Sequence, residues 1–181
     1  MTPDEAWRIL EQADLICDEA QVQNSIRRMA SEISSILGES NPLVLVIMRG
    51  GIVFAGQLVP LLRFPLELDY AHATRYGDAT TGGELRWSVS PPAEVNNRSV
   101  LIVDDILDAG HTLKAVKDEV IALGAKSCQI AVLAQKDLGK SKPVTADFVG
   151  LTLPDRYVFG CGLDVRGAWR NLPQIYALKG Q

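Results

Sequence analysis

Histidine and cysteine are scarce in this chain and widely scattered. The 181 residues include 2 histidines and 3 cysteines. Cys17, Cys128 and Cys161 are odd in number, lie far apart and form no Cys-x-x-Cys pair, so neither a disulfide framework nor a zinc site of the usual spacing is expected. A histidine-rich metal site is not expected either. This cysteine usage favours a reducing, cytoplasmic compartment.

Long apolar runs and an excess of basic charge are also missing. No run approaches the roughly 20 apolar residues of a membrane-spanning helix. The first residues, MTPDEAWRILEQADLI, carry acids where a secretory signal carries basic side chains. The net charge of −4 disfavours broad binding to nucleic acid. We therefore expect a mature globular protein whose partners include neither a membrane nor a nucleic acid.

Short apolar runs alternate with helical patterns along the chain. A capping box begins a helix at Thr2-Pro3, and apolar spacings of three and four residues predict helices over 22–37, 52–63 and 110–123. Strands are predicted at 43–48, 66–76, 84–90, 99–105, 128–135, 147–153 and 157–163. This alternation predicts one α/β domain, residues 1–181, with a mainly parallel central sheet flanked by helices.

The segment VLIVDDILDAGHTL, residues 100–113, places three aspartates where a buried strand ends. Ligands of such sheets lie at the carboxyl ends of the strands, and the start of the following helix favours an anion. Asp104 and Asp105 cannot both face one way in a regular strand, but a chain leaving the sheet can aim at least one of them at a ligand. The pattern therefore fits a sugar phosphate.

A simpler interpretation of the same residues stays open on spacing alone. Asp108 can be only a helix cap, Gly110 only a turn residue, and the acid pair only solvated charge at a strand end. Neither a G-x-x-x-x-G-K-[ST] loop nor a G-x-G-x-x-G turn after a strand is present to decide between them.

VLIVDDILDAGHTL resembles the phosphoribosyl-pyrophosphate-binding segment of type I phosphoribosyltransferases. MRGGIVFAGQL, from Met48, resembles the pyrophosphate loop of hypoxanthine-guanine phosphoribosyltransferases. ADFVGLTLPDRYVFGCGLDVRGAWRNLPQIYAL is similar to their purine-binding carboxyl-terminal segment. The resemblance covers nearly all of the chain after the first helix. It implies the type I phosphoribosyltransferase fold, with a small hood formed by the terminal segments.

The resemblance assigns three groups of residues to the sugar and its metal. Asp104 and Asp105 match the acid pair that binds the ribose hydroxyls and Mg²⁺, and Asp164 matches a second magnesium ligand. Carboxylates are natural ligands of the divalent cation that neutralises a pyrophosphate leaving group. The 5′-phosphate cradle corresponds to Ala109, Gly110, His111 and Thr112. The residues matched to pyrophosphate contacts are Arg49, Gly50 and Arg170.

The base is assigned to a second set of residues. Asp108 matches the carboxylate that takes or shares the purine N7 proton, which would make the attacking nitrogen more nucleophilic. Lys136 matches the lysine that donates to the 6-oxo group; lysine cannot accept, so it disfavours a 6-amino purine. Tyr157 matches the aromatic residue stacked on the base, and the backbone of Val158 reads the edge of the base.

Four features depart from the commoner family pattern. The acid pair is Asp-Asp where Glu-Asp is usual, His111 replaces a lysine or arginine, and Arg49 stands where lysine is frequent. The loop from Arg75 and Tyr76 to Arg86 lacks the usual Ser-Tyr pair. Its glycine and threonine content nevertheless predicts a loop that closes over the site.

The expected activity is therefore purine salvage. Hypoxanthine or guanine would react with phosphoribosyl pyrophosphate, with Mg²⁺ as cofactor, to give IMP or GMP and pyrophosphate. We also expect a homo-oligomer, either a dimer or a tetramer. The alternatives are a sister transferase that prefers xanthine or adenine, and a non-catalytic regulator of the same fold that senses phosphoribosyl pyrophosphate or binds RNA. Lys136 argues against adenine, and the acidic net charge gives RNA binding no support.

Overall fold

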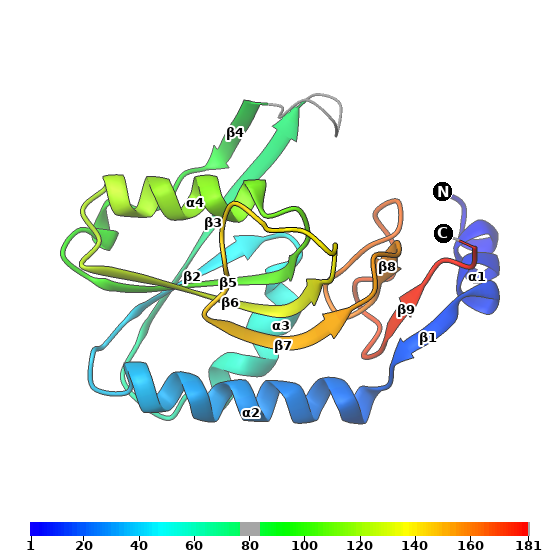
Figure 1. The fold of residues 1–181 in the computed structure, drawn as a ribbon, viewed down its shortest axis with the longest axis horizontal. Coiled ribbons are helices and arrows are strands. Elements are labelled where there is room, and N and C mark those ends of the chain that lie inside the picture. Colours follow the sequence, from blue (N-terminus) through cyan, green and yellow to red (C-terminus); the bar gives the residue numbers. More distant parts are fainter. Residues whose placement is uncertain (77–83, 181) are drawn as a thin grey trace.

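Residues 1–76 and 84–180 are described by the computed structural model, and they form two β-sheets (Figure 1). The larger sheet has six strands in the order β4-β3-β2-β5-β6-β7. All neighbours are parallel except β3 and β4, which confirms the prediction of a mainly parallel sheet. These strands are β2 (Leu43–Met48), β3 (Glu67–Tyr76), β4 (Glu84–Val89), β5 (Ser99–Leu107), β6 (Ser127–Lys136) and β7 (Phe148–Leu153).

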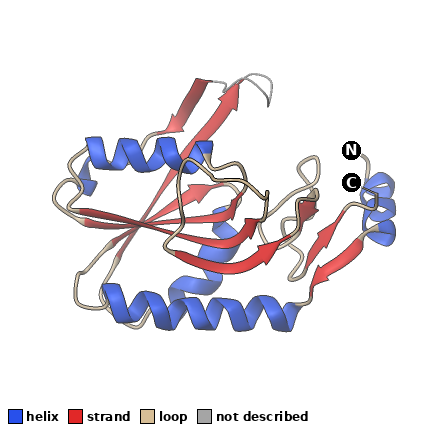
Figure 2. Ribbon diagram, in the orientation of Figure 1, coloured by secondary structure: helices blue, strands red, loops and turns tan. Residues whose placement is uncertain are grey.

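Helices cover both faces of this sheet (Figures 1 and 2). One face carries α2 (Glu19–Leu37) and α3 (Gly51–Leu58), followed by a short 3₁₀ turn, η1 (Val59–Leu61); the other carries α4 (His111–Ala122). A second 3₁₀ turn, η2 (Ala93–Val95), precedes β5. The apolar stripe of α2 is at most 3% exposed and consists of Val22, Ile26, Met29, Ile33 and Leu37. The helical spacing in the sequence therefore correctly predicted the buried face of α2.

The ends of the chain build a separate small sheet beyond the carboxyl ends of β5, β6 and β7 (Figure 1). Its strands, in the order β1-β9-β8, are β1 (Asp14–Cys17), β9 (Ile175–Ala177) and β8 (Val158–Phe159), and α1 (Pro3–Gln12) lies beside them. We call residues 1–17 and 158–180 the hood. Because the hood faces the strand ends, it closes one side of the place where ligands are expected.

The structure corrects three of the predicted boundaries. The stretch 157–163 is not one strand: only Val158–Phe159 is extended, and Gly160, Cys161 and Gly162 all have positive φ, which turns the chain back. The strand predicted at 99–105 continues to Leu107, and the helix predicted at 52–63 is α-helical only over Gly51–Leu58. The short strands β1 and β9 have no counterpart in the predictions.

Within the described residues, every helix is too short or too polar to cross a membrane.

Candidate active site

Asp104 and Asp105 lie within β5, not beyond its end. The ladder with β6 continues through Asp104, Ile106 and Leu107, so the strand has not ended at the acid pair. Asp105 is 8% exposed, and its backbone N–H donates to Asp104 Oδ1 at 2.9 Å. The expectation that the chain leaves the sheet at these residues is therefore wrong, because β5 continues to Leu107.

Both carboxyl groups are held in surroundings that disfavour their charge. Burial, and then the neighbouring negative charge of Asp105, raise the pKa of Asp104 well above its ordinary value. Burial also raises the pKa of Asp105, although a hydrogen bond with Asp104 and the positive charge of Arg170 act in the opposite direction. A ligand that supplies positive charge or hydrogen-bond donors would stabilise the ionised pair.

Gly50 and Gly162 pack directly against this acid pair. A Cβ atom on Gly50 would lie 1.8 Å from Asp105 Oδ2, and one on Gly162 would lie 2.4 Å from the Gly50 carbonyl oxygen. Gly162 also has φ +102°. This position therefore requires glycine both for the close approach to Gly50 and for the backbone conformation. The turn after β2, which carries the exposed Arg49 and contains a cis Met48–Arg49 peptide bond, therefore lies against β5 and the hood.

The turn from Asp108 to Thr112 leads into α4. Gly110 occupies the N-cap position with φ +86°, and the cap has no side-chain hydrogen bond. Asp108 is therefore not the cap, which removes the simpler interpretation of this residue. The backbone N–H groups at the start of a helix lack partners within the helix, so this turn, with the Thr112 hydroxyl beside it, suits a phosphate group.

Asp108 and Lys136 come together from the ends of β5 and β6. Lys136 Nζ donates to Asp108 Oδ2 at 3.1 Å and lies 4.0 Å from Asp155 Oδ1. The Lys136 side chain is 14% exposed and that of Asp108 is 51% exposed. Parallel strands place their carboxyl ends at one edge of the sheet, which is why two residues 28 positions apart meet here.

A pocket of about 260 Å³ contains this pair. Tyr157 is 44% exposed, so its ring is available at the pocket and is not part of the core. Val158 begins β8 and lies next to Tyr157 in the pocket wall. The lining residues are Asp105, Ile106, Asp108, Lys136, Tyr157, Val158, Leu163 and Asp164. The pocket thus combines an aromatic ring, apolar walls, a donor and several carboxylates.

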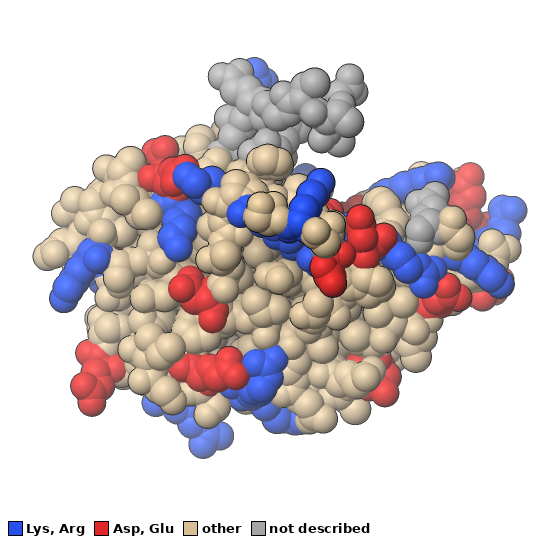
Figure 3. Space-filling view, in the orientation of Figure 1, with Lys and Arg blue, Asp and Glu red and all other residues tan. Residues whose placement is uncertain are grey.

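Arg170 connects the hood to the acid pair. Its guanidinium forms an ion pair with Asp164, donates to the Gly162 carbonyl at 2.5 Å and lies 3.9 Å from Asp105 Oδ2. Asp164 Oδ2 also accepts from the Gly167 N–H at 2.6 Å. The space-filling view shows acidic and basic side chains side by side where the body of the protein meets the hood (Figure 3).

The carboxylates fit Mg²⁺ only in combination with a substrate. Within the described ranges, no three His, Cys, Asp or Glu side chains gather closely enough to hold a metal by themselves. Mg²⁺ commonly binds through one or two carboxylates together with phosphate oxygens and water. Asp105 and Asp164 in the pocket wall, with Asp104 next to Asp105 in β5, provide hard oxygen donors of that kind.

Several contributors to the site had no recognised signal in the sequence. Ile106 and Leu163 form apolar walls of the pocket. Gly162 packs on Gly50 in the tight turn at 160–162. The repeated glycines of the GCGLD stretch were the signal in the sequence that could have predicted this turn. Arg75 and Tyr76 end β3. The segment 77–83, which makes up most of the predicted closing loop, lies outside the described residues.

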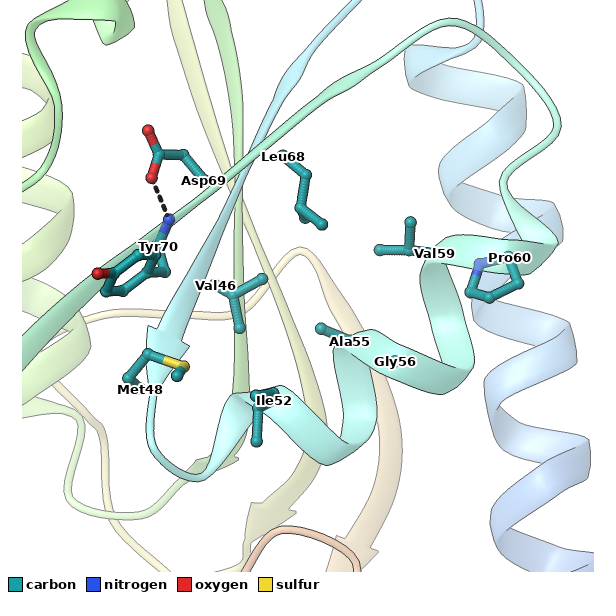
Figure 4. Close-up of a pocket in the computed structure, with 10 residues that line it drawn as sticks. All are labelled: Val46, Met48, Ile52, Ala55, Gly56, Val59, Pro60, Leu68, Asp69 and Tyr70. Atoms are coloured by element: carbon teal, nitrogen blue, oxygen red, sulfur yellow. Dashed lines mark hydrogen bonds between the residues drawn. The ribbon is translucent and has the colours of Figure 1, made fainter.

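A second and larger pocket, of about 540 Å³, lies away from these polar groups (Figure 4). Apolar side chains from β2, β3, α3 and η1 point into it, including Val46, Leu68, Ile52 and Val59. Asp69 turns its carboxylate to the Tyr70 backbone N–H at 2.7 Å. This apolar groove lacks the convergent polar groups of a site for a charged sugar.

Comparison with known proteins assigns the chain to a family. The family model described as a phosphoribosyl transferase domain matches residues 14–166. The chain is 32% identical over 166 residues to the hypoxanthine-guanine phosphoribosyltransferase of Bacillus subtilis, covering 91% of this chain and 92% of the relative. It is 34% identical over 166 residues to the bifunctional protein TilS/HprT of Listeria innocua, which covers 91% of this chain; this chain spans only 26% of that relative.

A solved structure shows the same fold. A hypoxanthine-guanine phosphoribosyltransferase from Bacillus anthracis superimposes with a TM-score of 0.85 at 28% sequence identity, covering 91% of this chain and 98% of that one. The predicted fold, a mainly parallel sheet with a hood made from the chain ends, is confirmed.

Proposed function

Because the chain belongs to the hypoxanthine-guanine phosphoribosyltransferase family, we infer that it is an enzyme of purine salvage. It transfers the 5-phosphoribosyl group from phosphoribosyl pyrophosphate to hypoxanthine or guanine, which gives IMP or GMP and releases pyrophosphate. The observation that carries this inference is the 260 Å³ pocket. It unites Asp108, Lys136 and Tyr157 beside a phosphate-binding turn.

We assign the recognition of the base to the pocket walls and the Lys136 ammonium. The ring of Tyr157 stacks on the purine, Val158 reads its edge, and Lys136 Nζ donates to the 6-oxo group. Because lysine offers only donors, a 6-amino purine would leave that contact unmade. Asp108 takes or shares the N7 proton as the opposite ring nitrogen attacks C1′. The 3.1 Å contact between Lys136 and Asp108 supports placing both side chains at the edge of the purine that carries the 6-oxo group and N7.

We assign the sugar and its phosphates to the last part of β5, the turn that follows it, the turn after β2 and the Arg170 loop of the hood. The turn Ala109–Thr112 holds the 5′-phosphate at the start of α4. Asp104 and Asp105 accept hydrogen bonds from the ribose hydroxyls, and Arg49, Gly50 and Arg170 contact pyrophosphate. Arginine suits pyrophosphate because its planar guanidinium can make bidentate contacts.

We propose Mg²⁺ as the cofactor, held by Asp104, Asp105 and Asp164 together with substrate oxygens. When bound, the cation neutralises the charge of the pyrophosphate leaving group. Arg170, which pairs with Asp164 and lies near Asp105, would exchange part of that contact for the pyrophosphate.

We also propose that residues 1–181 form one phosphoribosyltransferase domain, located in the cytoplasm, that acts as a homo-oligomer. Its partners are the two substrates, without nucleic acid or membrane. The apolar groove supports self-association, because Leu68, Ile52 and Tyr70 at its edges are 58%, 51% and 48% exposed.

The deciding experiment offers four purine bases to the purified protein with phosphoribosyl pyrophosphate. We expect IMP from hypoxanthine and GMP from guanine when Mg²⁺ is present, and loss of both products in excess EDTA. Preferential turnover of xanthine would show that the protein is the sister transferase that prefers xanthine. Binding of phosphoribosyl pyrophosphate without turnover of any base would instead indicate the regulator, and equal turnover in EDTA would contradict the role of Mg²⁺.

A further inference from the structure

Lys142 lies outside the pocket but is bonded to both strands that end there. It belongs to the segment between β6 and β7, and its side chain is partly buried. Lys142 Nζ donates to the Leu107 carbonyl at 2.8 Å and to the Lys136 carbonyl at 2.6 Å. Leu107 is the last residue of β5 and Lys136 the last residue of β6. One ammonium group therefore ties together two neighbouring strand ends.

These two carbonyls belong to the backbone that carries the Asp108–Lys136 pair. Asp108 directly follows Leu107, whose side chain is 1% exposed and anchors this point in the core. Lys136 carries its own side chain into the pocket, where Nζ meets Asp108. A shift of either strand end would change the separation and direction of both groups.

Burial disfavours the positive charge of Lys142, and nearby carboxylates offset that effect only in part. Burial lowers the pKa of Lys142, while the carboxylates of Asp108, Asp137 and Asp155 raise it and the ammonium of Lys136 lowers it. Hydrogen bonds from a charged donor are about twice as strong as neutral ones. A residue that only covered the loop would not need a charged donor placed between two carbonyls.

We propose that Lys142 is a positioning residue for base recognition: it fixes the ends of β5 and β6 so that Asp108 and Lys136 meet the purine in register. This inference rests on the proposed function and deepens it. Lys142 touches neither substrate in this scheme, because its effect passes through the two backbone carbonyls.

The test replaces the ammonium and compares the two substrates. In Lys142→Met, kcat/KM for guanine and hypoxanthine should fall by about 10–100-fold, which is the loss of one or two charge-assisted hydrogen bonds. KM for phosphoribosyl pyrophosphate should stay within about threefold of the wild-type value. Lys140→Met is the matched control, because Lys140 is an exposed lysine two residues earlier in the same segment; it should change neither value.

A double-mutant cycle separates positioning from general support of the fold. If Lys142 acts through Lys136, then Lys142→Met should cost much less in a Lys136→Ala background than in the wild type. Equal losses for both substrates, full additivity with Lys136→Ala, or unchanged kinetics would each overturn the inference. If Lys142→Met does not fold, Lys142→Gln is measured instead: its shorter, neutral side chain removes the ammonium from the two carbonyls, so the same loss confined to the bases is expected and the same outcomes would overturn the inference. An inactive wild-type protein would instead contradict the proposed function itself.

Discussion

Asp108 and Lys136 pair with each other although each is assigned to a different atom of the purine. The contact is 3.1 Å long, but half of the Asp108 side chain is exposed, so the pair contributes only about 0–1 kcal/mol to stability. A base entering the pocket can therefore replace this contact at little cost. The contact holds the Asp108 carboxylate and the Lys136 ammonium close together in the pocket.

The first prediction concerns the Asp108 carboxylate. Asp108→Asn should lower kcat by roughly 10²–10⁴, because an amide cannot take the purine proton. Binding of phosphoribosyl pyrophosphate, measured by calorimetry, should be preserved. The thermal midpoint should hardly change, since Gly110 and not Asp108 occupies the cap of α4. A variant with full activity would show that Asp108 is not the catalytic base.

The second prediction concerns the Lys136 ammonium. Lys136→Ala should raise KM for guanine and hypoxanthine by about 10–100-fold, because one hydrogen bond from a charged donor is lost. The affinity for phosphoribosyl pyrophosphate should remain nearly the same, because that substrate is assigned to the turn between β5 and α4 and not to Lys136. Steady-state kinetics with each substrate varied in turn measures both effects. Parallel losses for the two substrates would assign Lys136 a structural role.

At the scale of whole elements, local patterns predicted the central strands and failed where glycine changes the backbone. The runs at 43–48 and 99–105 were identified because buried parallel strands are apolar on both faces. The stretch YVFGCGL has the same apolar content, yet Gly160 and Gly162 adopt φ near +100° and end β8 after two residues. Apolar content alone does not distinguish a strand from a tight, buried turn.

The contacts of Lys142 and Arg170 were beyond prediction for another reason. Lys142 reaches backbone carbonyls 35 and 6 residues away, and such acceptors leave no trace in a residue pattern. Arg170 was assigned through resemblance, but its ion pair with Asp164 depends on how the hood loop folds back. Motifs identified the chemistry of the site, whereas the packing of loops determined its geometry.

The third prediction concerns α1, which precedes the region matched by the family model. Trp169 Nε1 donates to the Ala6 carbonyl at 2.9 Å, and its ring meets that of Trp7 at a centroid distance of 4.9 Å. Arg170, which is assigned to pyrophosphate, follows Trp169 directly in the sequence. Trp169→Phe removes the donor but keeps a ring, so the docking of α1 should weaken by about 0.5–1.5 kcal/mol.

Two measurements check this prediction. Amide hydrogen exchange should become faster in α1, and KM for phosphoribosyl pyrophosphate should rise by about 2–10-fold as Arg170 loses support, whereas KM for the base should not change. Trp87→Phe, a change in β4 away from the hood, is the control. If exchange in α1 is unchanged, α1 is not held by Trp169.

At the scale of the whole molecule, the sheet leaves one part of its surface uncovered. β4 pairs with β3 from His72 to Tyr76, and within the described chain no strand covers the outer edge of the first half of β3. On the face shared with α3, Leu68 and Tyr70 border the apolar groove (Figure 4). Contiguous apolar surface of this kind marks interfaces, and most soluble oligomers are symmetric assemblies of one chain.

The last prediction tests whether a second copy covers this groove. Leu68→Glu should shift the protein from oligomer to monomer in size-exclusion chromatography with light scattering, because a buried carboxylate without a partner costs several kcal/mol and weakens association by about 10² or more. Ile121→Glu is the matched control: Ile121 is 52% exposed on α4, on the opposite face of the sheet, and its substitution should leave the mass unchanged. A wild-type protein that is monomeric at all concentrations, or a Leu68→Glu variant with the wild-type mass, would show that the groove is not the interface.

Because Met48 and Ile52 line the groove on either side of Arg49 and Gly50, a monomeric variant should also bind pyrophosphate more weakly than the control, which links assembly to the site.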